Sequence, residues 1–371
     1  MNITLVAGAR PNFMKIAPII KAIKSAQEKG KDINYRLVHT GQHYDRKMSG
    51  DFFEQLGIPE PDINLECGGG SQAEQTAAIM IKFEQDLIAH RPDLVLVVGD
   101  VTSTMACTIT AKKLCVDAGH VEAGIRSGDM TMPEEINRIV TDSLCDYFFT
   151  TSEIANVQLR KNGVPDSRIH LVGNTMIDTL LQNIEKIRKP AFWDEHNLSS
   201  SNFFLMTLHR PSNVDDPGKL SSILSAINEA SGNFPIVFPV HPRTRKIIDK
   251  FKIRNDKMFM IDPQGYLEFM YLVKNAKGII TDSGGITEEA TVLHVPCLTL
   301  RNSTERPETI TLGTNELIGD DINKLKPSLK KIIDGAWKKG TVPPFWDGKT
   351  SKRIIDTICS IYMVKKLANA G

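Results

Sequence analysis

Cysteine is scarce in this sequence, and its six occurrences form no recognisable metal or disulfide pattern. None lies in a Cys-x-x-Cys pair, and no cluster of cysteine and histidine has the spacing of a zinc site. We therefore interpret the cysteines as reduced thiols of the core and expect no bound metal.

Neither sign of charge is in excess, and long hydrophobic runs are missing. The 45 Lys and Arg residues balance 44 Asp and Glu residues. This balance gives no electrostatic reason to expect nucleic acid or a membrane as a partner, although a local basic cluster could still bind a phosphate. The apolar run at 3–7 is too short for a signal peptide, and no later run could span a bilayer. The sequence thus predicts a cytoplasmic protein.

What the chain does have is a regular alternation of short apolar runs and longer amphipathic ones. Its 371 residues favour two domains, and the alternation is typical of parallel strands joined by helices. The pattern restarts near a hinge at 173–176, so we predict two α/β domains. The final helix, at 351–366, could pack on either domain. The predicted strands are 3–7, 35–40, 94–98, 118–122, 147–150, 169–172, 203–208, 236–239, 258–261, 278–281 and 297–300, with helices that include 16–29, 73–90, 104–114 and 178–187.

Polar and glycine residues follow many of these strands. In open α/β sheets, ligands bind outside the carboxyl ends of the strands, so seven such loops together predict a ligand cleft. The loops are Gly8-Ala9-Arg10-Pro11, Thr40-Gly41-Gln42-His43, Gly99-Asp100, Glu122-Ala123-Gly124, His209-Arg210, His241-Pro242-Arg243 and Asp282-Ser283-Gly284-Gly285.

The last of these loops resembles an anion site. Glycines let backbone N–H groups approach a phosphate, and the start of the following helix adds its positive dipole end; the alternative is a plain tight turn. Glu288 and Glu289 follow. They are ordinary partners of a helix dipole, but beside a diphosphate a functional Glu would have to reach a neutral group such as ribose hydroxyls. A mononucleotide diphosphate satisfies both demands.

The first loop does not fit a nicotinamide cofactor. Gly8-Ala9-Arg10-Pro11 is not a G-x-G-x-x-G motif, and no acidic residue ends the second strand. Arg10 and Lys15 are cations near a helix start, where the dipole disfavours them. They indicate an anionic ligand, unless they are simply solvated.

Two carboxylates end runs that are expected to be buried strands. Asp100 and Glu122 would each pay a desolvation cost unless paired or used, and burial suits proton transfer. Asp100 could instead cap the helix that starts near Thr102. For Glu122 we favour function.

The segment around Glu134 has a stronger structural interpretation. Thr131 and Glu134 fit a capping box, and Glu134 and Arg138 fit an i,i+4 ion pair.

His209 and His241 each follow a strand with an Arg close behind, which favours phosphate or base contact over two core histidines. Without a third ligand they do not indicate a metal.

Taken together, these motifs resemble the UDP-N-acetylglucosamine 2-epimerases of the non-hydrolysing bacterial type. The resemblance spans nearly the whole chain in order. It rests on Gly8-Ala9-Arg10-Pro11, Gly99-Asp100, His120-Val121-Glu122-Ala123-Gly124-Ile125-Arg126, Pro133-Glu134-Glu135-Ile136-Asn137-Arg138, His209-Arg210, Thr281-Asp282-Ser283-Gly284-Gly285 and Thr304-Glu305-Arg306-Pro307-Glu308.

The resemblance implies two Rossmann-like domains facing across a cleft, the glycosyltransferase-B architecture, and commonly a homodimer. Because the family's last helix returns to the first domain, we expect domains at 1–172 with 352–371 and at 173–351. It also implies reversible C2 epimerisation of UDP-N-acetylglucosamine to UDP-N-acetylmannosamine through a 2-acetamidoglucal, without cofactor or metal, usually for surface polysaccharide synthesis.

Residue by residue, the resemblance assigns roles at matching positions. The acid/base group would be Asp100, Glu122, Glu134 and His209, which overturns the structural preference for Glu134. The substrate contacts would be Arg10, Lys15, Arg138 and Arg306 as cations, Phe269 against uracil, Ser283, Gly284 and Gly285 around the diphosphate, and Glu289 at the ribose. His241 joins the predicted substrate contacts on its own strand-end position.

Several alternatives remain at this point. A retaining glycosyltransferase, a hydrolysing epimerase and a catalytically silent nucleotide-sugar sensor share parts of the pattern, and the sugar could carry a C3 acetamido or a C6 carboxylate group. Relatives regulated by their own substrate carry a second glutamine shortly after the position of Gln42, where this chain has Asp45. We therefore expect no allosteric activation by a second UDP-sugar.

Overall fold

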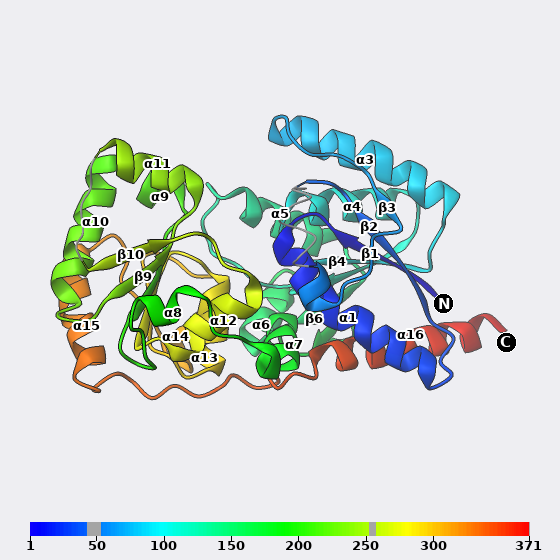
Figure 1. The fold of residues 1–371 in the computed structure, drawn as a ribbon. Helices are drawn as coiled ribbons and strands as arrows, with labels where there is room; N and C mark the ends of the chain where they lie inside the picture. The colour runs from blue at the N-terminus through cyan, green and yellow to red at the C-terminus, as the bar shows by residue number, and fades with distance from the viewer. Residues whose placement is uncertain (43–52, 252–256, 371) are drawn as a thin grey trace. The chain divides into compact units, whose positions relative to one another are not determined.

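A computed structural model describes residues 1–42, 53–251 and 257–370. Asp45 lies outside the described residues, so the expected loss of allosteric activation stays a prediction. The chain forms two compact units, Met1–Gln182 with Pro344–Gly371 and Asn183–Pro343 (Figure 1). Each is built around one parallel sheet, as predicted.

The first unit contains a seven-stranded sheet in the order β3-β2-β1-β4-β5-β6-β7. Its central strands read as continuous apolar runs because helices cover both faces; every residue of β4 is buried. Helices α1 and α16 lie on one face, and α3, α4 and α5 on the other (Figure 1). The elements are β1 Asn2–Ala7, α1 Arg10–Glu28, β2 Asn34–His39, β3 Ile63–Asn64, α3 Gln72–Ala89, β4 Leu94–Val98, α4 Thr102–Lys113, β5 Asp117–Val121, α5 Pro133–Leu144, β6 Tyr147–Thr150, α6 Glu153–Lys161, β7 Ile169–Leu171, α7 Thr175–Asn183 and α16 Thr350–Ala370.

The second unit contains a six-stranded sheet in the order β10-β9-β8-β11-β12-β13. Its core joins the inner face of the sheet to α10 and α15, through side chains such as Phe204, Leu224 and Leu329. The elements are α8 Phe192–Glu195, β8 Phe204–Thr207, α9 Pro211–Val214, α10 Pro217–Ala230, β9 Ile236–Pro239, α11 Pro242–Lys250, β10 Met258–Ile261, α12 Tyr266–Asn275, β11 Gly278–Thr281, α13 Gly285–Val292, β12 Cys297–Thr299, α14 Pro307–Thr311, β13 Asn315–Leu317 and α15 Leu325–Ile333.

The division between the units differs by about ten residues from the boundaries expected at 172/173 and 351/352. The structure places 173–182 and 344–351 with the first unit. Buried hydrogen bonds hold these segments there. The carboxylate of Asp178 on α7 accepts from the backbone N–H of Thr350 at 3.0 Å and of Ser351 at 2.7 Å. The indole of Trp346 donates to the carbonyl of Thr151 at 3.0 Å.

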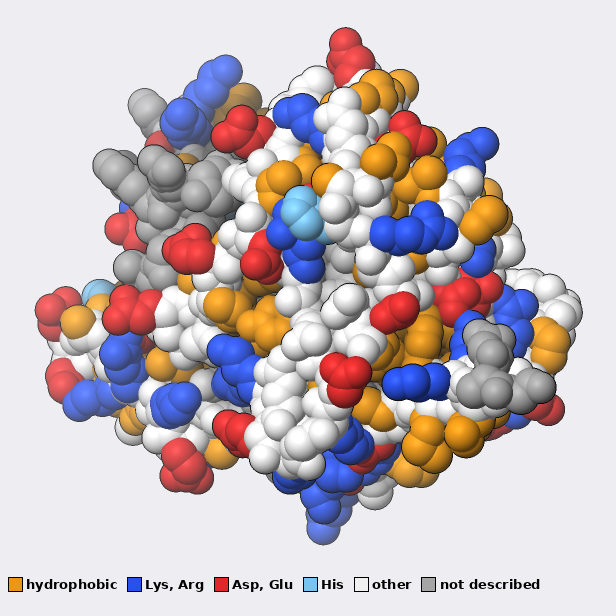
Figure 2. Space-filling model, turned by 90° about the vertical axis from the view of Figure 1, so that its right-hand side faces the viewer, with side chains coloured by type: hydrophobic (Ala, Val, Ile, Leu, Met, Phe, Trp, Pro, Cys, Tyr) orange, Lys and Arg blue, Asp and Glu red, His pale blue; other side chains and the backbone are white. Residues whose placement is uncertain are grey.

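The surface agrees with the balanced composition. In the view of Figure 2, acidic and basic side chains are interspersed, with hydrophobic groups scattered between them. Among the helices of the described ranges, none is both long and apolar enough to cross a membrane.

Candidate active site

The turn between β1 and α1 is shaped by close packing. A Cβ on Gly8 would lie 2.0 Å from the Ser103 hydroxyl, so no larger residue fits. Asn12 closes the turn: its side-chain oxygen accepts from the N–H of Ala9 at 2.9 Å, and its amide nitrogen donates to the Val98 carbonyl at 2.9 Å. The first helical residue, Arg10, is exposed at this end. The turn therefore presents a cation at the carboxyl edge of the first sheet.

Glu122 lies at the same edge and is bound to Lys15. The Lys15 ammonium is 2.6 Å from a Glu122 carboxylate oxygen, and the two side chains are only 11% and 3% exposed. A buried carboxylate is costly unless a cation compensates it. Lys15 supplies that compensation and so keeps a charged acid in place beside the sheet.

The backbone of Glu122 is strained. Its φ is 72°, a left-handed conformation that disfavours a residue with a Cβ. Such conformations cost on the order of 1–3 kcal/mol and gather at functional sites. The backbone N–H groups of Glu122 and Ala123 both donate to the Phe149 carbonyl, at 2.9 and 3.2 Å, and hold the turn. In this conformation the Glu122 side chain lies against Lys15.

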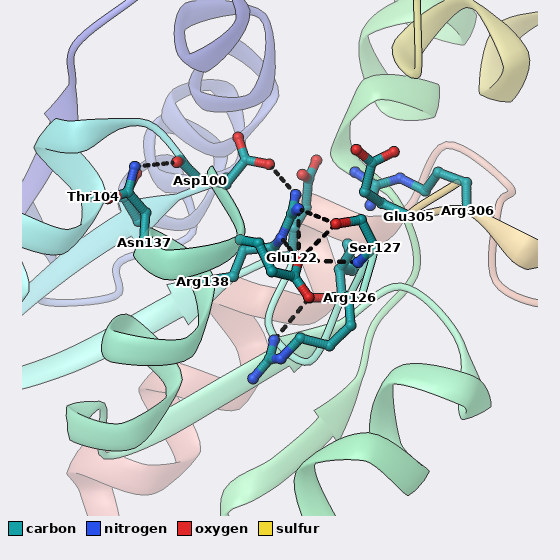
Figure 3. A network of polar contacts seen from close by, with 12 residues as sticks. Asp100, Thr104, Glu122, Arg126, Ser127, Asn137, Arg138, Glu305 and Arg306 are labelled. Atoms are coloured by element: carbon teal, nitrogen blue, oxygen red, sulfur yellow. Dashed lines mark hydrogen bonds and ion pairs between the residues drawn. The ribbon is translucent and has the colours of Figure 1, made fainter. Parts of the chain in front are cut away.

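Asp100 follows β4 and does not cap α4. The N-cap residue of that helix is Val101, with no side-chain cap, so the capping alternative is wrong. Instead the Asp100 carboxylate accepts from Arg138 at 2.5 Å, and its backbone carbonyl accepts from the Asn137 amide at 2.9 Å (Figure 3). The Asp100 side chain remains 34% exposed while that of Arg138 is 3% exposed. The buried cation thus holds an accessible carboxylate.

The structural interpretation of Glu134 is also wrong. The N-cap residue of α5 is Met132, with no side-chain cap, and the Thr131 hydroxyl donates to Asp129 instead. Arg138 pairs with Asp100 and with Glu135, not with Glu134. Within the described part of the chain, no hydrogen bond or ion pair holds the half-buried Glu134 side chain. It is therefore available for a ligand.

Glu135, which the sequence reasoning missed, holds the loop around Arg138. Its carboxylate accepts from the backbone N–H of Ser127 and of Gly128, each at 2.9 Å, and from Arg138 at 2.7 Å. Burial alone would raise the pKa of Glu135, but these hydrogen bonds bring it below its ordinary value. The adjacent acid in the Pro-Glu-Glu sequence thus has a structural role, while Glu134 does not.

In the second unit, Asp282 positions His209. The His209 ring Nδ1 lies 2.9 Å from the Asp282 carboxylate, and the backbone N–H groups of His209 and Arg210 donate to the same carboxylate. Asp282 is fully buried, whereas the His209 side chain is 57% exposed. Burial would raise the pKa of Asp282, but the hydrogen bonds, His209's first, lower it. An ionised Asp282 therefore fixes one ring nitrogen and leaves Nε2 of His209 for chemistry.

The glycine turn after β11 lies over an ion pair. Helix α13 begins at Gly285 without a side-chain cap, and a Cβ on Gly285 would meet open space. A Cβ on Gly284 would lie 3.2 Å from the guanidinium of Arg301, which binds Glu305 through two hydrogen bonds of 2.8 and 2.7 Å. Ser283 donates its N–H to Thr281 at 2.9 Å. The turn is thus supported from below, and the uncapped start of α13 after it suits an anion.

Three acidic side chains are buried behind this turn. Glu289 is 4% exposed and accepts from the Tyr266 hydroxyl at 3.3 Å; burial and the neighbouring charge of Glu288 raise its pKa to about 8. Glu288 forms an ion pair with Arg306. Both carboxylate oxygens of Glu308 are buried and have no hydrogen-bond partner among the residues described.

The remaining predicted residues lie at the same edge of the second sheet. His241 follows β9 and is exposed, while the side chain of Arg243 is outside the described part of the chain. Phe269 is half-buried on α12. The residues that the structure describes include no group of three His, Cys, Asp or Glu placed to hold a metal.

Comparisons with known proteins agree with this geometry. A family model described as UDP-N-acetylglucosamine 2-epimerase matches residues 25–359. The crystal structure of Methanocaldococcus jannaschii UDP-GlcNAc 2-epimerase, in complex with UDP-GlcNAc and UDP, is 40% identical with a TM-score of 0.85, over 96% of this chain and 99% of that one. A Pseudomonas aeruginosa UDP-2,3-diacetamido-2,3-dideoxy-D-glucuronate 2-epimerase is 39% identical over 97% of this chain and 100% of its own.

A more distant likeness concerns the fold alone. A Polygonum tinctorium UDP-glucosyltransferase is 10% identical, with a TM-score of 0.57 over 98% of each chain. The two parallel α/β sheets are therefore of the glycosyltransferase-B type, as expected. The family match, by contrast, extends over nearly the full length. The chain belongs to the UDP-N-acetylglucosamine 2-epimerase family of isomerases.

Proposed function

We propose that this enzyme interconverts UDP-N-acetylglucosamine and UDP-N-acetylmannosamine without hydrolysing them. The observation that carries the proposal is Glu122, a buried carboxylate in a strained left-handed conformation beside the Lys15 ammonium. A glycosyltransferase that only transfers sugar has no need for this acid together with Asp100 and Glu134. Inverting a carbon centre requires acid/base groups for both faces of that carbon.

The reaction proceeds by elimination and re-addition. A base takes the C2 proton, the bond between C1 and the diphosphate oxygen breaks, and UDP leaves a 2-acetamidoglucal with a C1=C2 double bond. UDP then adds back to C1 while an acid delivers a proton to the opposite face of C2. We assign the proton transfers to Asp100, Glu122, Glu134 and His209. No redox step is involved.

The departing UDP needs positive charge and N–H donors. We assign Ser283, Gly284 and Gly285 to the diphosphate, because α13 begins there without a side-chain cap. Arg10, Lys15, Arg138, His241 and Arg306 are assigned as further substrate contacts. Phe269 would stack on the uracil, and Glu289 would accept from the ribose hydroxyls.

Hydrogen exchange at C2 tests the mechanism. In deuterium oxide, with UDP-N-acetylglucosamine and no acceptor, both epimers are expected to gain deuterium at C2, as followed by proton NMR. Release of free N-acetylmannosamine with UDP would identify a hydrolysing enzyme instead. An unchanged UDP-sugar with full retention of protium would overturn the proposal.

A modified UDP-sugar is the second candidate substrate. The Pseudomonas aeruginosa relative, which acts on a 2,3-diacetamido glucuronate, is nearly as similar as the Methanocaldococcus enzyme. The same NMR assay with a panel of UDP-sugars distinguishes them. We expect the highest kcat/KM for the unmodified N-acetylhexosamine; a preference for the diacetamido uronate would reassign the substrate but keep the chemistry.

We further propose that the enzyme is a homodimer. Apart from the family resemblance, the support is Ile81 and Ile88, which lie two turns apart on α3 and are 61% and 69% exposed. Residues seven apart lie on the same face of a helix, and a contiguous exposed apolar patch marks a protein interface. Light scattering on the purified enzyme measures the mass directly.

A further inference from the structure

A buried carboxylate on α5, Asp142, links several segments at the edge of the first sheet. One oxygen lies 2.7 Å from Nδ1 of His120. The other accepts from the backbone N–H of Gly124 at 3.0 Å and from the Arg126 guanidinium at 2.6 Å. The Asp142 side chain is 2% exposed and that of His120 is fully buried. No role in the proposed reaction has been assigned to either.

Both ring nitrogens of His120 lie within hydrogen-bond distance of a partner. Nε2 lies 2.8 Å from the backbone carbonyl of Gly99, which can only accept. Nδ1 faces Asp142, which already accepts from two other donors. The His120 ring and the Arg126 guanidinium thus both pack against one buried carboxylate. Burial alone would raise the pKa of Asp142. The interactions of the carboxylate with His120 and with Arg126 outweigh burial and bring the pKa of Asp142 below its ordinary value.

This network joins the two backbone segments that carry Asp100 and Glu122. Gly99, whose carbonyl His120 binds, immediately precedes Asp100 and has a φ of 68°. Glu122 lies between His120 and Gly124, so both ends of its strained turn are tied to Asp142. Gly124 cannot be replaced: its φ is 78°, and a Cβ there would lie 2.4 Å from the Ala155 carbonyl oxygen. Figure 3 shows Arg126 on the loop beside Glu122.

Helix α5 supplies the other supports of these segments. Asn137 and Arg138 hold Asp100, and Glu135 holds the loop at Ser127. Asp142 is one turn beyond Arg138 on the same face of the helix, since residues four apart are neighbours there. The segments around Asp100, Glu122 and Ser127 are thus all fixed to helix α5.

We infer that Asp142 and His120 are positioning residues that set the Glu122 carboxylate and the Asp100 segment relative to each other for proton transfer at C2. This inference rests on the proposed function, because it concerns the geometry of the acid/base groups. Neither residue is assigned to the substrate. They act through the Gly99 carbonyl and the turn at 122–124.

The test replaces Asp142 by Asn, which keeps the shape but turns one acceptor into a donor. That donor faces Gly124 N–H or Arg126, which also donate, or turns to Nδ1 of His120; in every orientation the charge that pairs with Arg126 is lost. A displacement of about 1 Å in an acid/base group can cost on the order of 10²-fold in rate. We expect kcat of Asp142→Asn to fall by roughly that factor, while UDP affinity measured by calorimetry stays unchanged.

The matched control is Asp146→Asn. Asp146 accepts from the backbone N–H of Ala118 at 2.8 Å and from Lys112 at 2.6 Å, and so supports the opposite end of the same strand. A general loss of stability would lower the activity of both variants, whereas positioning lowers only that of Asp142→Asn. Equal kcat values for Asp142→Asn and the wild-type enzyme would overturn the inference.

A second measurement uses the unmodified enzyme and does not depend on activity. With ¹⁵N-labelled histidine, one ring is expected to show an N–H signal protected from solvent exchange, because Nε2 of His120 donates to the Gly99 carbonyl and the ring is fully buried. A wild-type spectrum without such a ring would overturn the inference even if no variant folds. If the protected ring is present but no UDP-sugar is epimerised, the proposed function fails and the network stands.

Discussion

Glu289 offers a test of both the fold and the nucleotide site through the pH dependence of stability. Its carboxyl group is 4% exposed, and burial together with the charge of Glu288 raises its pKa from 4.5 to about 8. The folded protein therefore holds a proton that the unfolded chain releases above about pH 4.5. The free energy of unfolding therefore falls progressively as the pH rises from about 4.5 to about 8. Glu289→Gln, which cannot ionise, removes this fall.

The size of the effect follows from the pKa. At about 1.4 kcal/mol for each pH unit, the rise from 4.5 to about 8 amounts to about 5 kcal/mol. Most of it, on the order of 4 kcal/mol, falls between about pH 5 and about pH 8.5. The free energy of unfolding of Glu289→Gln minus that of the wild-type enzyme is therefore expected to grow by about 4 kcal/mol from about pH 5 to about pH 8.5. Urea unfolding of the second unit at several pH values measures this difference.

A surface variant serves as the control. Glu229 in the same unit forms an exposed ion pair with Lys326, so Glu229→Gln is expected to leave the pH dependence of stability close to that of the wild-type enzyme. Parallel stability curves for Glu289→Gln and the wild-type enzyme would refute the reasoning.

Ribose hydroxyls that donate to Glu289 would favour its charged form. UDP binding near neutral pH is therefore expected to release a proton, which calorimetry in two buffers detects.

Two further substitutions address the assigned site. Glu122→Gln keeps the shape of the side chain and removes its basicity, so kcat is expected to fall by about 10²–10⁴-fold while UDP still binds; activity within about threefold of wild type would make Glu122 a structural residue. Arg306→Ala is expected to weaken UDP binding by about 1.5–3 kcal/mol, the range of a charge-assisted hydrogen bond. Because Arg306 also pairs with buried Glu288, the calorimetry compares Glu288→Gln with and without the Arg306 change. Equal UDP affinities in that pair would remove Arg306 from the site.

Strands with a strong apolar pattern could be predicted from the sequence, and weak ones could not. The runs at 94–98 and 278–281 coincide with β4 and β11. The predicted strands omit β3, which has two residues, and β13, whose Asn315 and Glu316 interrupt the apolar pattern. Edge strands gain their order from pairing with a neighbour, which no local pattern reports. The start of α1 at Arg10, six residues before the predicted one, was hidden because Pro11 resembles a loop residue but suits a first helical turn.

The candidate site residues also fall into those that could be predicted from the sequence and those that could not. Carboxylates at strand ends, such as Asp100 and Glu122, could be found from position alone. The supports could not: Asp282 meets His209 across 73 positions of sequence, and Asp142 meets His120 across 22. The left-handed backbone of Glu122 has no sequence signature either, since glycine would be expected there. The place of Asp282 at a strand end could be read from the sequence as for Asp100, but its contact with His209 could not.

The bonds from Asp178 to Thr350 and Ser351 have a consequence for biosynthesis. They are formed between parts of the first unit that are separated by all of Asn183–Pro343. On the ribosome, residues 1–182 emerge early but must wait for α16 before Asp178 and Trp346 can be buried. The second unit, encoded without interruption, can fold first, although domains more often fold from the N-terminus onward. Premature termination near residue 343 would thus damage the half of the protein that was made first.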